Sequence, residues 1–278
     1  MSADTVRIGG DLTPALLTAP VWSEAMIAAA GIPVVDAPFV SVGGGIGSFV
    51  TVDYLRIAGV PADQIRVLSN IDTPWQTYEY LTRVSQIPGP MMCMLVNFLG
   101  LRHLTENLLP QIVDGGAIAN ISSGAGMGYL INMENIFQLL SITDHAEAKA
   151  WCEAHPDVVK EGYSFSKECI IVWTMMRCVE LAEQRTIRIN AIGPGPTETA
   201  FMPDVVKQMG QEFFDNFPKP LYGRNATAEE QAWPLVYLNS DLASIITGQI
   251  VWTDQGMAGG LFTGKIDPNT MIPADMQQ

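Results

Sequence analysis

Short apolar runs alternate with longer helical segments along most of the chain, and this alternation restricts the fold more than any other feature of the sequence. Runs that predict buried strands occupy residues 39–42, 65–68, 117–121, 187–191 and 250–253. Segments with a helical pattern occupy residues 49–57, 91–113, 163–183 and 229–238. Because strands separated by helices pair in parallel, the sequence predicts an α/β fold with a doubly wound, Rossmann-like parallel sheet in a single domain.

The same alternation divides the 278 residues into four parts. We expect an N-terminal extension of unknown role, an atypical βαβ dinucleotide-binding segment, a catalytic part and a C-terminal tail. These parts comprise residues 1–37, 38–88, 89–265 and 266–278. An apolar content of 48% in a chain of this length is enough to bury a sizeable core.

Charge and cysteine usage exclude several classes of function. The net charge of −14, from 15 basic and 29 acidic residues, argues against nucleic acid and against an anionic membrane surface as partners. The four cysteines and three histidines lack the spacing of a metal site, so we expect no metal. The N-terminus lacks the pattern of a secretory signal and no apolar run is long enough to span a membrane, which predicts a cytoplasmic protein.

Tyr163 and Lys167 are the residues that most directly suggest chemistry. They are four positions apart in a predicted helix, so their side chains lie on one face, a turn from each other. A phenol has a pKa of about 10, and a neighbouring ammonium is expected to lower it toward the range useful for proton transfer. Taken alone the pair is also typical of a solvated helix surface, so its meaning depends on the surrounding sequence.

Further motifs occur in order around this pair. Asn120-Ile121-Ser122-Ser123 ends a predicted strand, Val96-Asn97-Phe98-Leu99-Gly100 lies in the preceding helix, and a loop with Pro194-Gly195 follows the next strand. Over residues 94–262 this set resembles the short-chain dehydrogenase/reductase family. The resemblance implies that Ser123 holds the substrate oxygen and that Asn97 supports a proton-relay water. Lys167 would bind the nicotinamide ribose.

The loop after residue 193 completes the resemblance at the cofactor. In the family, its Pro-Gly turn passes under the nicotinamide and a threonine bonds the carboxamide. Pro194 and Gly195 match the turn, Thr199 is the best match for the threonine, and Thr197 is the alternative. Gln255 stands where the family usually has a second glycine.

Residues 129–161 form an insertion, and their mixed polar and apolar pattern predicts one or two surface helices. Because of this insertion, Ser123 and Tyr163 lie unusually far apart in the sequence. This resembles the subgroup around bacterial 3α-hydroxysteroid dehydrogenase and coniferyl-alcohol dehydrogenase. A steroid-like or aryl alcohol or ketone is the substrate that this resemblance implies. A homodimer or homotetramer is the expected assembly, because family members commonly form them.

The N-terminal third departs from the family. A glycine turn at Gly43, Gly45 and Gly47 follows the first predicted strand, where backbone amides and a helix N-terminus could receive a pyrophosphate. Asp72 could bind a ribose and favour NAD over NADP, although its spacing from the turn is longer than usual. Residues 38–88 also resemble part of a flavin-linked oxidoreductase, which leaves FAD as an alternative cofactor.

Three functions therefore remain open at this point. The first is hydride transfer between NAD(P) and a secondary alcohol or ketone, through Asn97, Ser123, Tyr163 and Lys167. The second is a flavin-dependent oxidoreductase that uses the glycine turn of residues 43–48. The third is a non-enzymatic scaffold with an incomplete adenine site.

Overall fold

The computed structural model describes residues 6–7, 39–42, 65–68, 89–199, 202, 206 and 210–271. The chain forms two compact units. One unit comprises Met1–Gln86 and Ala228–Ile245, and the other comprises Ile87–Thr227 and Ile246–Gln278. The predicted helix at residues 49–57 lies outside the described residues.

The described strands of the first unit form a small parallel sheet. Strand β3 (Ile65–Leu68) lies in the centre, between β1 (Val6–Arg7) and β2 (Phe39–Val42). Phe39 stands opposite Ile65 in the parallel register. The predicted strands at 39–42 and 65–68 are confirmed, whereas β1 was not predicted, because a two-residue strand leaves no periodic pattern. Helix α12 (Ala228–Asn239) confirms the helix predicted at 229–238, and the 3₁₀ turn η6 (Asp241–Ala243) follows it.

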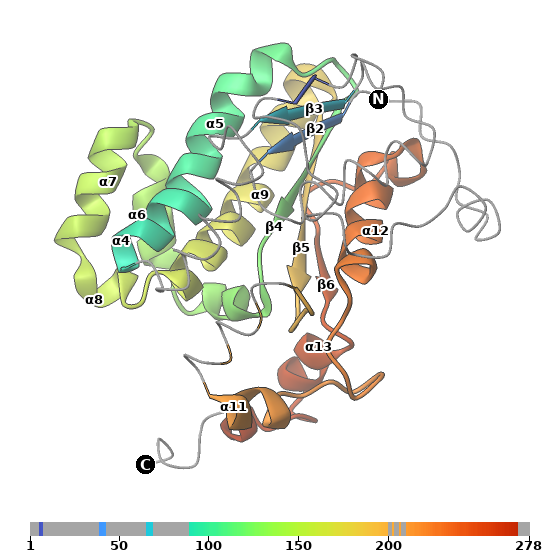
Figure 1. Cartoon of the computed structure of the whole chain (residues 1–278). Helices are drawn as coiled ribbons and strands as arrows, with labels where there is room; N and C mark the ends of the chain where they lie inside the picture. Colours follow the sequence, from blue (N-terminus) through green and yellow to red (C-terminus); the bar gives the residue numbers. More distant parts are fainter. Residues whose placement is uncertain are drawn as a thin grey trace. The chain divides into compact units, whose positions relative to one another are not determined.

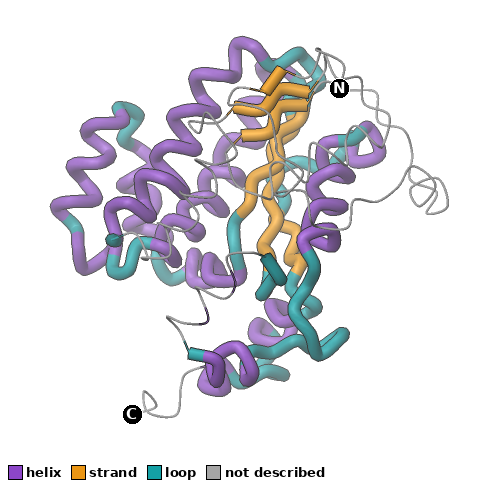
Figure 2. Tube along the Cα trace, viewed as in Figure 1, coloured by secondary structure: helices purple, strands orange, loops and turns teal. Residues whose placement is uncertain are grey.

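The second unit holds a parallel sheet in the order β4 (Ala117–Ile121), β5 (Arg188–Pro194) and β6 (Ile250–Thr253). The arrows of these parallel strands point the same way in Figure 1, and Figure 2 draws the strands in orange. Strand β5 continues beyond the predicted end at residue 191, because Gly193 and Pro194 still pair with β6. A Cβ at position 193 would meet the Trp252 ring at 2.2 Å, so this strand position needs glycine.

Helices cover this sheet. Helix α9 (Tyr163–Arg185) contacts β4 and β5, and also α4 (Pro90–Met94) and the π-helical turn η3 (Leu95–Leu99). These helices lie on the same side of the sheet in Figure 1. The short helix α13 (Met257–Phe262) lies beyond the carboxyl ends of the strands. Parallel strands with helical cover confirm the predicted α/β class.

The helix predicted at residues 91–113 is broken into pieces. The π-helical turn η3 separates α4 from α5 (Gly100–Leu108), and the 3₁₀ turn η4 (Leu109–Gln111) ends the run. The Gly100 backbone N–H bonds to the Leu95 carbonyl, and a Cβ on residue 100 would lie 2.5 Å from that oxygen. Glycine therefore permits the wider turn at this place, which periodicity alone does not predict.

The insertion forms three helices, α6 (Met133–Ser141), α7 (His145–Ala154) and α8 (Pro156–Val159). They are not confined to the surface as predicted, since each of them contributes buried side chains to the hydrophobic core. The buried members of that core from the insertion are Ile136, Leu139, Leu140, Ala148, Cys152 and Val159. The unit also contains α11 (Gln211–Asn216) and the 3₁₀ turn η7 (Pro268–Met271).

The described residues contain neither a membrane-spanning helix nor a cluster of metal-binding side chains. No helix among them is long and apolar enough to cross a membrane. No group of three or more histidine, cysteine, aspartate or glutamate side chains in the described ranges is placed to hold a metal ion.

Phe98 tests the core that carries the π-helical turn. Its side chain is fully buried, edge-on to Trp173 with ring centroids 6.5 Å apart, whereas Phe137 on α6 is 44% exposed. We expect Phe98→Ala to lower the free energy of unfolding by about 3–5 kcal/mol, because it removes buried apolar surface and leaves a cavity. Phe137→Ala is the control and should cost far less. Urea denaturation followed by circular dichroism measures both, and equal losses would contradict this placement of the core.

Candidate active site

Tyr163 and Lys167 lie in the first two turns of α9, as predicted. The Lys167 Nζ atom is 5.6 Å from the centroid of the Tyr163 ring, and Tyr163 is 42% exposed. The helix starts after Gly162, whose φ of 80° is left-handed and whose Cβ would lie 2.2 Å from the Pro90 carbonyl oxygen. Glycine at 162 therefore lets the start of α9 lie directly against the start of α4.

Ser123 reaches the same place from the end of β4. A hydrogen bond joins its side chain to Tyr163, and its hydroxyl also accepts the backbone N–H of Ala125 at 3.2 Å. The neighbouring Ser122 has a structural role instead, because its buried hydroxyl donates to the Lys167 carbonyl oxygen at 2.8 Å. Of the two adjacent serines, Ser123 is the one that contacts the phenol.

The electrostatics of the pair differ from the prediction. Burial lowers the pKa of Lys167 to about 8, and its ammonium donates to the Ile121 carbonyl oxygen at 3.0 Å. Surrounding protein raises the pKa of Tyr163 despite its partial exposure, and the Ser123 hydrogen bond is what lowers it. The predicted lowering by Lys167 is therefore wrong for this arrangement, because desolvation outweighs attraction from an ammonium that is bonded elsewhere.

Asn97 lies in the π-helical turn and contacts α9, as the predicted site requires. Its side-chain amide donates to the Ser166 hydroxyl at 3.2 Å, and Ser166 donates in turn to the Tyr163 carbonyl oxygen at 2.6 Å. Asn97 is thus tied to the backbone of Tyr163. Ser166 was not predicted, although its position three residues after Tyr163 in the helix is a signal that could have found it.

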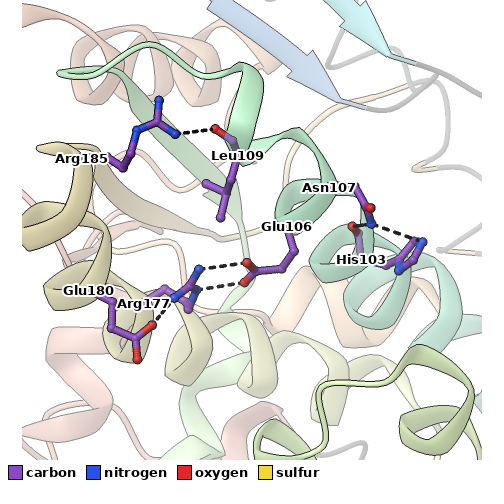
Figure 3. A network of polar contacts seen from close by, with 7 residues as sticks. All are labelled: His103, Glu106, Asn107, Leu109, Arg177, Glu180 and Arg185. Atoms are coloured by element: carbon purple, nitrogen blue, oxygen red, sulfur yellow. Dashed lines mark hydrogen bonds and ion pairs between the residues drawn. The ribbon is translucent and has the colours of Figure 1, made fainter.

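Ion pairs hold α5 alongside α9. Arg177 donates two hydrogen bonds to the Glu106 carboxylate, both at 2.9 Å, and also pairs with Glu180 (Figure 3). Arg185 donates to the Leu109 carbonyl oxygen at 3.0 Å, at the end of the α5 run. A bidentate arginine bond fixes direction as well as distance, so these contacts keep the helix that carries Asn97 in register with α9.

Pro194 is the last residue of β5, and Gly195 begins the loop that follows the strand. A Cβ on residue 195 would lie 3.1 Å from the Asp254 Cα, so glycine allows this close approach to the end of β6. Thr197 donates its hydroxyl to the Gly195 carbonyl oxygen at 3.0 Å and pairs with Ala226 through a β-bridge. Thr199 is exposed. The two predicted threonines therefore differ, since Thr197 stabilises the turn itself.

The carboxyl ends of β4 and β5 bring these groups together. A Cβ on Gly124, next to Ser123, would lie 3.6 Å from the Pro194 carbonyl oxygen. Tyr163 is the common neighbour of the predicted catalytic residues. It is bonded to Ser123, its ring faces the Lys167 ammonium, and its carbonyl oxygen is joined to Asn97 through Ser166. Gly43, Gly45, Gly47 and Asp72 lie outside the described residues.

Gln255 stands at the position where the resemblance to the family predicts a glycine, and its backbone conformation shows the reason for that preference. Its φ of 63° is left-handed, a conformation that costs energy for a side chain with a Cβ. Here the side chain is used, because it donates to the Arg224 carbonyl oxygen at 2.6 Å and accepts the Tyr222 N–H at 3.0 Å. Gln255 thus fastens the loop that leads into residue 226.

Removing the Ser123 hydroxyl should raise the pKa of Tyr163 further, because that hydrogen bond is the one influence that lowers it. We expect Ser123→Ala to move the Tyr163 titration to higher pH. An ultraviolet titration of tyrosinate, taken as the difference from Tyr163→Phe, measures this shift. Ser141→Ala, at an exposed serine on α6, is the control and should leave the titration in place, so equal shifts in the two variants would refute the assigned contact.

Comparison with known proteins provides an independent test. Residues 155–258 match the family model described as enoyl-(acyl carrier protein) reductase. The chain is 30% identical over 181 residues to coniferyl-alcohol dehydrogenase of Pseudomonas sp. strain HR199, which covers 64% of this chain and 71% of that enzyme. It is 26% identical over 164 residues to 3-oxoacyl-(acyl-carrier-protein) reductase FabG of Thermotoga maritima, covering 58% of this chain and 54% of that one.

The fold has a counterpart among solved structures. The 3-alpha-hydroxysteroid dehydrogenase from Pseudomonas sp. B-0831, complexed with NADH, superposes with a TM-score of 0.63 at 20% identity. The superposition covers 82% of this chain and 99% of that one, which confirms the predicted Rossmann-like α/β fold. These matches give no support to the predicted flavin-like character of residues 38–88.

Proposed function

Because the chain belongs to the short-chain dehydrogenase/reductase family, we propose that it transfers a hydride between NAD or NADP and a secondary alcohol or ketone. The observation that carries the proposal is the hydrogen bond between Ser123 and Tyr163, with the Lys167 ammonium one helical turn away. A hydroxyl, a phenol and an ammonium at one place suit proton exchange with a carbinol oxygen.

The described residues fit the nicotinamide half of the cofactor. An ammonium has three N–H donors, and Lys167 gives one of them to Ile121, which leaves donors for ribose hydroxyls. The exposed Thr199 supplies a hydroxyl for the carboxamide, while Thr197 uses its own in the turn. When bound, the nicotinamide would accept or donate the hydride at C4. The adenine end would fall to Gly43, Gly45, Gly47 and Asp72.

Each residue then has a separate task. Tyr163 exchanges a proton with the substrate oxygen, and Ser123 orients that oxygen by hydrogen bonding. Lys167 binds the ribose. Asn97 holds a relay water, since its amide group is fixed by Ser166 and its carbonyl oxygen can still accept a hydrogen bond.

A bulky apolar substrate, either a steroid-like or an aryl alcohol, is the class that we propose. Similarity to coniferyl-alcohol dehydrogenase supports it. By analogy with the family, we further propose a homodimer or homotetramer in the cytoplasm.

Tyr163→Phe tests the function. We expect kcat for alcohol oxidation to fall by at least about 100-fold, because proton transfer loses its group, while dinucleotide affinity is retained. Absorbance of the reduced nicotinamide measures the rate. Tyr237→Phe, at a 44% exposed tyrosine on α12, is the control and should keep wild-type kcat. Undiminished turnover in Tyr163→Phe would sink the proposal.

The Lys167 ammonium makes cofactor binding depend on pH. Because the pKa of Lys167 is lowered to about 8, the charged form is present below that pH and is lost above it. We expect dinucleotide affinity to weaken about tenfold as the pH rises through this value, since charge-assisted hydrogen bonds disappear. Fluorescence titration across the range measures it. Lys167→Gln should bind weakly at every pH, and a pH-independent affinity in the wild type would contradict the assignment.

Calorimetric titration of NAD, NADP and FAD side by side separates the proposal from its two alternatives. Binding of NAD or NADP alone supports the dehydrogenase. FAD binding, with a yellow purified protein, would favour the flavin-dependent oxidoreductase. Binding of none of the three would favour the non-enzymatic scaffold.

A further inference from the structure

A buried carboxylate, Glu168, stands next to Lys167 on α9 and has no part in the proton transfer proposed above. The residue is only 4% exposed, and its Oε2 atom accepts a hydrogen bond from the Asn132 side-chain amide at 2.7 Å. Burial raises the pKa of Glu168, and the Asn132 bond acts in the opposite direction. Glutamate is rarely buried without a partner, so this bond is what allows the carboxylate to remain inside.

Asn132 bonds to Glu168 instead of capping the helix that it begins. It occupies the N-cap position of α6, where asparagine usually bonds to the first free backbone amides of the helix. Its side chain makes no such cap here. The side-chain amide bonds instead to Glu168, 36 positions away on α9, so the contact joins the start of α6 to α9.

The segment between Ser123 and Asn132 lies flush against the same two residues of α9. A Cβ on Gly126 would come within 3.0 Å of the Lys167 carbonyl group, and a Cβ on Gly128 would lie 2.5 Å from the Glu168 Oε1 atom. Glycine at 126 therefore permits the close approach to the α9 backbone, and a side chain at 128 would have to displace the Glu168 carboxylate. This segment contains the 3₁₀ turn η5 (Gly124–Leu130).

Ser123 lies at the N-terminal end of this segment and Asn132 at its C-terminal end. The Ser123 hydroxyl is held by the Ala125 N–H within η5, so its direction follows the placement of that turn. The Ser122 hydroxyl, bonded to the Lys167 carbonyl oxygen, fixes the segment before Ser123. Glu168 and Asn132 supply the corresponding bond beyond it.

We propose that Glu168 is a positioning residue, whose bond to Asn132 clamps residues 124–132 onto α9 and thereby aims the Ser123 hydroxyl at Tyr163. The proposal rests on the proposed function for its effect on turnover, whereas the clamp itself can be measured without activity. Lys160 and Glu161 are the charged groups that act on Glu168, with opposite effects on its pKa.

Glu168→Ala tests the clamp, with hydrogen exchange and steady-state kinetics as the two readouts. We expect faster amide exchange in residues 124–132, with β5 exchanging as in the wild type. We also expect kcat to fall by about 10- to 100-fold, the usual effect of misplacing a group near the reacting atoms. Dinucleotide affinity should stay within about twofold of wild type, since cofactor contacts lie elsewhere.

Three further variants sharpen the test. Glu168→Gln keeps an acceptor oxygen for Asn132 and should recover most of kcat. Asn132→Ala should match Glu168→Ala, and the double variant should lose little more, because both remove the same bond. Glu183→Ala changes an exposed glutamate on the same helix and should leave both readouts unchanged.

The possible outcomes are separable. Wild-type exchange in residues 124–132 of Glu168→Ala would overturn the clamp, and so would faster exchange spread equally over β5, which indicates general destabilisation. Faster exchange confined to the segment with wild-type kcat would overturn the positioning role. If the wild-type protein turns over no alcohol, the proposed function fails, while exchange confined to the segment still supports the clamp.

Discussion

The close approach of helix α9 to the carboxyl end of β4 is the contact on which the rest of the structure depends. It is bonded in both directions, because the Lys167 ammonium donates to the Ile121 carbonyl oxygen while the Ser122 hydroxyl donates to the Lys167 carbonyl oxygen. These two bonds set the distance between helix and strand end. Ser123 and Tyr163 lie immediately beside them, so the geometry of the candidate site follows from the packing of the fold.

Helix α9 organises the other parts of the site through different faces. Its first turn receives Asn97 through Ser166, its middle pairs Arg177 with Glu106 on α5, and its buried Glu168 receives Asn132. The effects of substitutions at these positions are therefore expected to be non-additive, because the contacts are all made to the same helix.

Much of the fold and of the site could be predicted from residue spacing. Tyr163 and Lys167 meet because four positions bring side chains onto one helical face, and the strands at 117–121 and 250–253 carry local apolar patterns. The π-helical turn at Asn97 could not be predicted, since it depends on the fit of Gly100 beneath Leu95. The pKa of Tyr163 was predicted in the wrong direction, because burial is invisible in the sequence.

The sequence by itself determined the α/β class, the order of the strands along the chain and which residue types could carry chemistry. Only the tertiary structure decided that Ser122 bonds to the Lys167 carbonyl oxygen, that Thr197 serves the turn, and that Glu168 is paired with Asn132. The physical reason is the separation in sequence over which each kind of interaction acts. Helical and strand periodicities act between near neighbours, whereas desolvation and hydrogen-bond partners depend on residues far apart in the chain that packing brings together.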